Sequence, residues 1–589
     1  VPQGDDRYES SKLFFSRVSS DIKKIFPNAS VMLTGSIAIA RDLETAASED
    51  VARISRVSEI LVFIVLIAVL GSLASVILPY LGIVIGVVVG GGIAYIVAAS
   101  GAAEMISLTR TLIYVIPLGL GSDYAAYLVY RFREEYARLR DPKKAAEEAL
   151  RRAGPAIIAS ALTVIAGFGS LALGWEFPLF RSLGVFMPLV VAITATSSLT
   201  LVPAVLALVG GSKWFSWGFK GFGGFGGAVS SLAMRINRLG LLVPAIFIVI
   251  SIVSLALYPS IQASHDLRLF LPSDSPSIVS LDAMASDIGY GFVFPTYVVM
   301  VKNTSIGLED LRSIEDLSRS IEKIDGVKSV EGPTRPFGEP LSISQDLLRD
   351  PYVLRYISDN TSYLRIVLSH NPFSQEAVDT LKKIREVFRS WGEENGYKIY
   401  VGGSTAASEE LDRLVNSLFW QRVLPFAVAS MIVIFTVVFG SLLAAILSVA
   451  IVVLSSFVSM VLTGVIFNNV FSTAMIWFLP QVVFTAMLGV GMDYNSFYMA
   501  RAREVCLDRG KCGSEGTAMA TGAVGRLVIG LALVVAAAFG SLMLSSSIGL
   551  RQIGLSLLAS ALLISSAASY LVAPPLLSIL GRRAWRKLV

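Results

Sequence analysis

Two acidic residues, each followed by a tyrosine, lie inside long apolar segments of the sequence. Asp123 and Tyr124 occur in GLGSDYAAY, Asp493 and Tyr494 occur in GVGMDYNSF, and each Asp precedes the arginine that ends its apolar run by eight residues. At 1.5 Å per helical residue, both carboxyls are about 12 Å inside the apolar boundary. An ionised carboxylate there costs at least about 2.5–3.5 kcal/mol, so it must be paired, hydrated or protonated. A proton relay requires carboxyls that can gain and lose a proton at this depth.

The residues around each carboxyl suggest one site shared between two helices. Adjacent helical residues point about 100° apart, so a tyrosine cannot readily bond its own aspartate. If the two motifs face each other across a two-fold axis, Asp123 meets Tyr494 and Asp493 meets Tyr124. Small residues allow helices to approach closely within membranes. The motif glycines predicted to do so are Gly119, Gly121, Gly489 and Gly491.

The motif has two other interpretations, a purely structural role and a phosphate loop. Each aspartate could simply join two helices through hydrogen bonds, although two carboxyls at the same depth exceed what that role needs. The glycines superficially resemble a phosphate loop, but the motif lies mid-helix and lacks the lysine. Ser160 and Thr163 are candidate secondary relay residues, yet Leu531 and Val534 at the matching later positions favour ordinary packing for both.

The composition is that of a membrane protein. Of 589 residues, 54% are apolar and 16% are charged, with a mean hydropathy of +0.68, whereas soluble domains carry about 25% charged residues. The net charge of +5 comes mostly from basic clusters beside apolar runs, so no nucleic-acid partner is expected. No HExxH, CxxC or P-loop motif occurs in the sequence. We therefore expect a transporter rather than an enzyme, with no metal or cofactor and with protons as the coupling ion.

Apolar segments long enough to cross roughly 30 Å of hydrocarbon need about 20 helical residues. Eleven are predicted, at 57–78, 80–100, 109–131, 154–174, 182–209, 240–258, 419–439, 442–466, 474–500, 524–545 and 551–579. Basic residues cluster within 131–152, within 501–511 and at the C-terminus, all on one side under an alternating topology, which predicts that this side is cytoplasmic. Cys506 and Cys512 fall on the same side, where thiols are usually reduced.

One long segment, 259–418, has the composition of a soluble domain and is predicted to lie outside the cell membrane. Strands are predicted over 297–303, 326–332, 362–369 and 397–403, and amphipathic helices over 308–324 and 375–392. Strand–helix–strand twice over predicts an α+β domain of the split βαβ, ferredoxin-like kind.

Comparing the sequence with itself reveals an internal repeat. VLGSL (69–73) matches VFGSL (438–442), GLGSDYAAYLVYRFREE (119–135) matches GVGMDYNSFYMARAREV (489–505), and AGFGSLALG (166–174) matches AAFGSLMLS (537–545). The offset stays between 368 and 371, which chance similarity of apolar helices does not produce. Both copies should cross the membrane in the same sense, about an axis along the membrane normal.

The predicted architecture is a multi-span α-helical membrane protein of two tandem six-helix repeats with extracytoplasmic α+β ferredoxin-like porter domains. By the repeat offset, the first helix and most of the first outer domain, roughly 130 residues, are expected to be missing before residue 1. The predicted parts are the end of a first porter domain (1–56), five helices of the first repeat (57–209), a Gly/Phe-rich cytoplasmic linker (210–239), the first helix of the second repeat (240–258), the second porter domain (259–418), five further helices (419–581) and a basic tail (582–589).

This organisation resembles the RND superfamily of transporters. The GxGxDY motif with its following RxREE, present in both halves apart from Val505 in place of the last acid, is most similar to the MmpL/HpnN-type lipid exporters. The resemblance implies that Asp123, Tyr124, Asp493 and Tyr494 relay protons. It further implies that proton entry drives the export of lipids or other hydrophobic or amphiphilic molecules.

Two alternatives remain open at this stage. One is a SecDF-like accessory of protein translocation, and the other is a sterol-sensing or receptor-like membrane protein that binds lipid without pumping. For the exporter, the substrate would be a membrane lipid or hydrophobic small molecule in the cytoplasmic membrane. No docked outer-membrane channel is expected because the outer domain has no room for long extensions, and both a monomer and a trimer fit the sequence.

Overall fold

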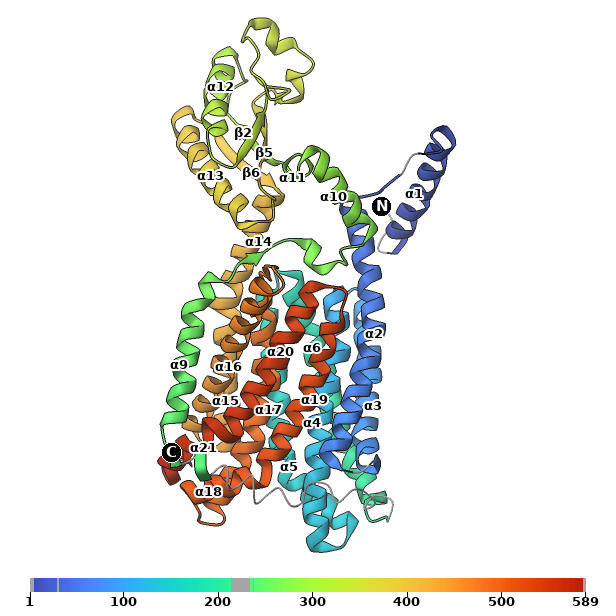
Figure 1. Ribbon diagram of the computed structural model, residues 1–589, viewed down its shortest axis with the longest axis vertical. Coiled ribbons are helices and arrows are strands. Elements are labelled where there is room, and N and C mark those ends of the chain that lie inside the picture. Colours follow the sequence, from blue (N-terminus) through green and yellow to red (C-terminus); the bar gives the residue numbers. More distant parts are fainter. Residues whose placement is uncertain (1–4, 29–30, 72, 213–233, 237, 586–589) are drawn as a thin grey trace. The chain divides into compact units, whose positions relative to one another are not determined.

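A computed structural model describes residues 5–28, 31–71, 73–212, 234–236 and 238–585. The chain forms two compact units, which are described separately (Figure 1). The first comprises Val1–Glu44 and Ala263–Leu414, and the second comprises Thr45–Gln262 and Val415–Val589. Most of the predicted linker and the last four residues of the predicted basic tail lie outside the described residues.

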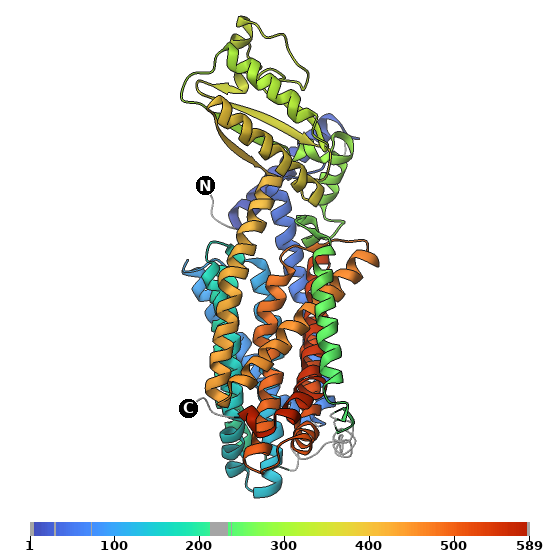
Figure 2. The same ribbon diagram turned by 90° about the vertical axis from the view of Figure 1, so that its left-hand side faces the viewer.

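The second unit is a bundle of long helices that run side by side in both views (Figures 1 and 2). In its first half these are α2 (Ser36–Leu70, which begins in the first unit), α3 (Leu73–Ala99), α4 (Ser107–Leu139), α5 (Pro142–Gly169) and α6 (Pro178–Val209). The later long helices are α9 (Leu242–Leu257), α15 (Leu424–Phe439), α16 (Leu442–Asn469), α17 (Leu479–Leu507), α19 (Arg526–Gly540) and α20 (Ile548–Ser566), and two short ones are α18 (Ser514–Ala520) and α21 (Ala573–Leu580).

Within the described chain, nine helical segments are long and apolar enough to cross a membrane. They correspond to nine of the eleven predicted spans, so the chain is a multi-pass membrane protein. Of the other two predicted spans, 474–500 lies largely in α17, and 57–78 runs from the end of α2 into the start of α3. α17 carries the polar sequence Asp493–Tyr494–Asn495 at its centre, which lowers its hydropathy.

A tight turn divides α2 from α3 earlier than the sequence suggests. Gly71 follows the last residue of α2 with φ +68°, and Gly440 follows α15 with φ +66°. Glycine takes this left-handed conformation at little cost and commonly ends helices. The prediction of one uninterrupted span over 57–78 is therefore wrong, because VLGSL is a helix–turn–helix junction, as VFGSL is in the second half.

The basic segment 131–152 is itself helical. α4 continues to Leu139 and α5 begins at Pro142, with Asp141 accepting a hydrogen bond from the Lys143 amide at 2.9 Å as its N-cap. The last predicted span, 551–579, is interrupted by a π-helical turn over Ala567–Leu571 before α21. Two prolines at the start of α21 lack the amide hydrogen needed to continue α20 without a break.

The first unit contains an antiparallel sheet whose strands lie in the order β3–β5–β2–β6. These strands and two helices form where the sequence predicts them: β2 (Thr296–Val301), α12 (Leu308–Glu322), β3 (Val327–Glu331), β5 (Thr361–Leu368), α13 (Gln375–Asn395) and β6 (Lys398–Gly403). Val298 and Ile366 on the sheet pack with Ile314 and Ile384 on the helices to make the core. Burying these side chains contributes about 1.5–3 kcal/mol each.

Candidate functional site

The two Asp–Tyr motifs lie on α4 and α17, in the interior of the helical unit. Asp123, Tyr124, Asp493 and Tyr494 are all fully buried. α17 is buried along nearly its whole length, and 94% of the most apolar stretch of α4 is buried. Helices that are covered on all sides present these side chains to other helices and not to lipid.

The two helices face each other through equivalent positions. The rings of Tyr127 on α4 and Phe497 on α17 stack with centroids 4.2 Å apart and an angle of 21° between their planes. In the sequence alignment of the two halves these two residues correspond, as do the aspartates one turn before them. The contact between matched residues therefore brings the two motifs to the same level of the bundle.

The two carboxyls share one environment. Asp123 and Asp493 lie close enough to interact electrostatically, and the Tyr494 hydroxyl lies within the field of both. Ser160, which α5 contributes, donates a hydrogen bond to Oδ1 of Asp493. Tyr124 lies next to the same serine. Two ionised carboxyls in one buried region repel each other, and protonation of either one relieves that repulsion.

Neither of the predicted Asp–Tyr pairs is hydrogen-bonded in this conformation. Within the described residues, the Tyr494 hydroxyl and both carboxylate oxygens of Asp123 have no hydrogen-bond partner, and neither has Oδ2 of Asp493. A buried carboxylate without a donor is costly unless it is protonated or hydrated. The bonding of Asp123 to Tyr494 and of Asp493 to Tyr124 stays a prediction.

Both Gly-x-Gly sequences provide close helix contacts. A Cβ atom on Gly119 would lie 3.2 Å from Cγ2 of Val535 on α19, and one on Gly489 would lie 3.2 Å from Cα of Val164 on α5. The valines also correspond between the two halves, so the contacts are reciprocal. A Cβ on Gly491 would approach Ile564 of α20 to 2.7 Å. Gly121 is buried as well.

Four charged residues join α4 and α17 two turns beyond the aspartates, and we call them the Arg/Glu ring. Arg131 contacts Glu504 of the other helix at 3.2 Å, and Arg501 contacts Glu134 at 3.2 Å. Within each helix the Arg131–Glu134 and Arg501–Glu504 distances are 3.0 and 2.8 Å. Each guanidinium thus binds one carboxylate from each helix, and the arginine side chains are only 3% and 7% exposed.

Comparison of the sequence with known proteins identifies a family. The sequence model of the MMPL family matches residues 9–221 and 269–588. The chain belongs to the MMPL family. The resemblance to MmpL-type proteins inferred from the two motifs is therefore confirmed at the level of family.

Relatives of this MMPL protein include transport proteins. It is 25% identical to the putative membrane protein ActII-3 of Streptomyces coelicolor, over 94% of this chain and 73% of that protein. It is 26% identical to the sulfolipid-1 exporter MmpL8 of Mycobacterium tuberculosis, over 57% of this chain and 31% of the exporter. The putative membrane protein YdgH of Bacillus subtilis is 28% identical over 55% of this chain and 37% of its own length. The chain thus spans about a third of the length of two of these relatives.

The candidate secondary relay residues of this MMPL protein differ in their placement. Ser160 reaches Asp493 directly, so it is part of the buried site although the sequence favours a packing role. The Thr163 hydroxyl instead donates to the backbone carbonyl of Ser160 at 2.7 Å, one turn earlier in α5. Leu531 occupies the position in α19 that matches Ser160, so the serine contact has no equivalent on the Asp123 side.

The Arg/Glu ring and several polar residues of α17 were not singled out by the sequence. Asn495, Ser496 and Tyr498 are fully buried, and the Asn495 amide donates to the Gly491 carbonyl at 3.3 Å. The matching positions of α4 are Ala125, Ala126 and Leu128, so α17 has the more polar interior here. A usable signal for the ring was the same Arg-x-x-Glu spacing in both halves.

The two cysteines of this MMPL protein depart from expectation. Cys506, in the last turn of α17, and Cys512 form a disulfide with a Cα–Cα distance of 4.4 Å. The prediction that both thiols are reduced is wrong in this structure. The bridge closes the short connection between α17 and α18.

Proposed function

We propose that this protein is a secondary active transporter that uses proton entry to export lipids or other hydrophobic or amphiphilic molecules. The observation that supports it most directly is the pair of fully buried carboxyls, Asp123 and Asp493, on two helices that face each other inside the helical bundle. Ionisable side chains in such places mark ion pathways and proton relays. The sulfolipid exporter among the relatives supports a lipid as the substrate class.

The proposed relay consists of Asp123, Tyr124, Asp493 and Tyr494, with Ser160 as an additional hydroxyl. Protonation of one carboxyl removes the repulsion between the two aspartates and allows α4 and α17 to come closer. Deprotonation restores the repulsion and favours separation. A proton entering the cell provides about 2.3 kcal/mol per 100 mV and about 1.4 kcal/mol per unit of pH difference, enough to bias two conformations of a helical bundle.

The proposed architecture consists of two copies of one helical unit related by a pseudo-two-fold axis. The reciprocal Gly119–Val535 and Gly489–Val164 contacts support it, as does the Arg/Glu ring. The sheet order β6–β2–β5–β3, with α12 and α13 as its crossovers, supports a ferredoxin-like porter domain. We further propose that the chain lies in the cytoplasmic membrane with its basic α4–α5 end toward the cytoplasm.

The test uses the protein in proteoliposomes that contain a pH-sensitive dye and a fluorescent phospholipid. Asp123→Asn, Asp493→Asn and the double variant keep the shape of the side chain but cannot exchange a proton. We expect the double variant to lose proton-driven lipid movement entirely. Thr163→Val, whose hydroxyl bonds only the backbone of its own helix, is the matched control in the same region of the bundle and should retain transport.

Undiminished proton-driven lipid movement in the double asparagine variant would refute the mechanism. Lipid binding that persists in all variants, with no proton flux in the unaltered protein, would instead indicate a lipid-binding receptor that does not pump. A translocation accessory would show proton flux that requires no lipid substrate.

A further inference from the structure

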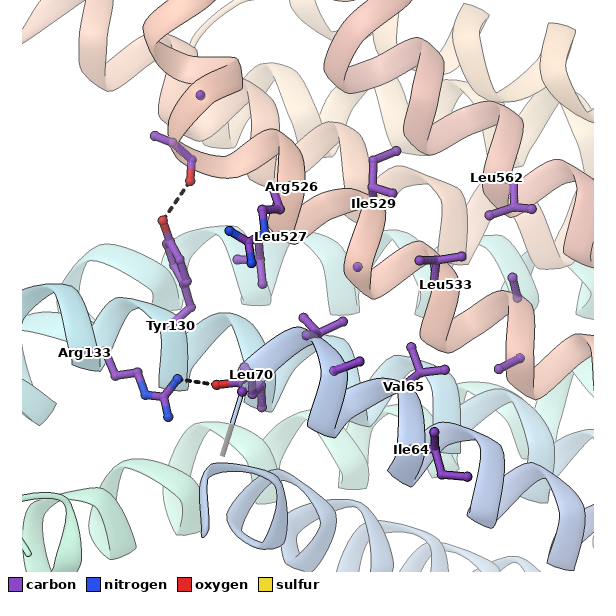
Figure 3. A pocket seen from close by; sticks show the side chains of 18 of the residues that line it. Ile64, Val65, Leu70, Tyr130, Arg133, Arg526, Leu527, Ile529, Leu533 and Leu562 are labelled. Atoms are coloured by element: carbon purple, nitrogen blue, oxygen red, sulfur yellow. Dashed lines mark hydrogen bonds between the residues drawn. The ribbon is translucent and has the colours of Figure 1, made fainter. Parts of the chain in front are cut away.

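A cavity of about 1010 Å³ lies within the helical unit, between α2, α4, α19 and α20 (Figure 3). Its volume is at the upper end of the range that small-molecule sites occupy, roughly 300–1,000 Å³. α4 contributes Tyr130, Arg133 and Glu134, which follow Asp123 by about two to three turns. Asp123 and Asp493 are not among its lining residues, so the cavity is distinct from the buried aspartate site.

Most of the cavity wall is apolar. α2 contributes Ile64 and Val65, α19 contributes Ile529 and Leu533, and α20 contributes Leu562 (Figure 3). Glycines and alanines on α2 and α19 make room between them. From its first to its last lining residue, the stretch 522–537 extends roughly 22 Å at 1.5 Å per residue. One leaflet of a bilayer has roughly 15 Å of hydrocarbon, half of the roughly 30 Å core, so the cavity is long enough for an acyl chain and a headgroup.

One end of the cavity is basic. Arg133 and Arg526 both line it, and Figure 3 shows them at the Leu70 and Tyr130 end. A terminal nitrogen of Arg133 donates to the Leu70 carbonyl at 2.5 Å, which fixes the guanidinium at the end of α2. The Tyr130 hydroxyl donates to the Ala523 carbonyl at 2.7 Å, and so ties α4 to the turn before α19.

The lining also includes the acidic residue Glu134. Glu134 is engaged in the Arg/Glu ring, at 3.0 Å from Arg131 and 3.2 Å from Arg501. A guanidinium has five N–H donors and suits the bidentate binding of phosphate. Arg133 and Arg526 thus give the cavity a positive end that is matched to an anionic group.

The cavity opens toward the outside of the bundle through apolar side chains. Ile64 is 55% exposed and Leu533 is 45% exposed, and both line it. On a bundle that spans a membrane, such residues face lipid. An occupant would enter sideways from the bilayer, with its chain along α2 and α19 and its headgroup at the arginines.

We propose that this cavity binds an anionic phospholipid, with the phosphate held between Arg133 and Arg526 and an acyl chain along Ile64, Leu533 and Leu562. Basic pockets between membrane helices recognise anionic headgroups, and the apolar wall excludes a free phosphate ion as the natural occupant. The site does not depend on the proposed transport activity, because lipid binding here would persist in a protein that moves no substrate.

The experiment measures lipid binding by native mass spectrometry of the purified, delipidated full chain. Phosphatidylglycerol, phosphatidylcholine and inorganic phosphate are titrated separately. We expect phosphatidylglycerol to bind at least tenfold more tightly than phosphatidylcholine, and phosphate alone not to bind measurably. Arg526→Gln should weaken phosphatidylglycerol binding by about tenfold or more, the usual effect of losing a charge-assisted hydrogen bond.

Two further variants locate the site. Ala537→Phe places a ring in the apolar part of the cavity and should weaken phosphatidylglycerol binding without changing any charge. Arg138→Gln, further along α4 with its side chain 59% exposed, is the control and should bind like the unaltered protein. Equal binding of the two lipids, phosphate binding without lipid, or phosphatidylglycerol binding unchanged in both Arg526→Gln and Ala537→Phe would each overturn the proposal.

Discussion

The Arg/Glu ring links the two halves of the chain close to the buried aspartates, and its most buried member is Arg131. Its guanidinium contacts Glu134 at 3.0 Å and Glu504 at 3.2 Å. Removing one partner of a buried ion pair typically costs about 3–5 kcal/mol. Glu504 keeps Arg501 at 2.8 Å and is 17% exposed, so part of the loss is compensated. We predict that Arg131→Gln lowers the free energy of unfolding by about 2–3 kcal/mol.

The pairwise part of this loss is measured by a double-mutant cycle of Arg131→Gln and Glu504→Gln. We expect a coupling energy of about 1–3 kcal/mol, the range found for directly contacting charged residues. Arg501→Gln should be as destabilising as Arg131→Gln, because the two arginines make reciprocal contacts. Arg138→Gln removes an ion pair of 2.8 Å with Glu135 from a side chain that is 59% exposed, and should cost less than about 1 kcal/mol.

The assay is reversible unfolding in mixed micelles, followed by tryptophan fluorescence. Two results would refute the reasoning about the ring. One is a coupling energy below about 0.5 kcal/mol. The other is equal destabilisation by Arg131→Gln and Arg138→Gln, which would mean that burial of the ring contributes nothing to stability.

Three further predictions follow from other parts of the chain. Gly489→Val should destabilise the helical unit by about 1–3 kcal/mol through overpacking. Gly402→Val, where an added Cβ would have nothing within 4 Å, should be tolerated. Equal unfolding midpoints of the two variants would contradict this. Burial opposes ionisation of Glu315, but hydrogen bonds from Arg335 hold its pKa below the usual value, so this carboxylate stabilises the first unit above about pH 4.3 and progressively less as the pH falls. Hydrogen-exchange protection factors of the β3 amides, corrected for the intrinsic exchange rate at each pH, should fall in acid, and Arg335→Met should abolish that step. An unchanged pH profile would count against the pair. Cys512→Ser should cost about 2 kcal/mol by the loop-closure relation, and no change in denaturant midpoint would show that the disulfide is not a stabilising constraint.

Local properties of the chain made much of the fold predictable. Nine of the predicted spans coincide with helices long and apolar enough to cross a membrane, because length and apolarity are sufficient criteria for such a segment. The strands and helices of 296–403 were found from their hydrophobic periodicity, which reflects one buried face. The boundary between α2 and α3 was predicted in the wrong place. A single residue, Gly71 in a left-handed conformation, ends α2 there, and the predicted span ran past it.

The two Asp–Tyr motifs show which features the sequence can predict and which it cannot. The sequence by itself determined that two carboxyls lie deep in apolar helices and that each is preceded by glycines at matched positions. The offset between the halves also predicted that the matched residues form one site, because a repeat pairs equivalent surfaces.

Only the tertiary structure decided which groups those carboxyls contact. Ser160 bonds Asp493, no predicted Asp–Tyr hydrogen bond is formed between the described residues, and Arg131 reaches across to Glu504. The cavity beside Arg526 likewise combines residues from four helices far apart in the sequence. Such contacts depend on how whole helices are rotated and spaced against one another. The packing of many side chains sets this arrangement, and a local pattern of residues does not contain it.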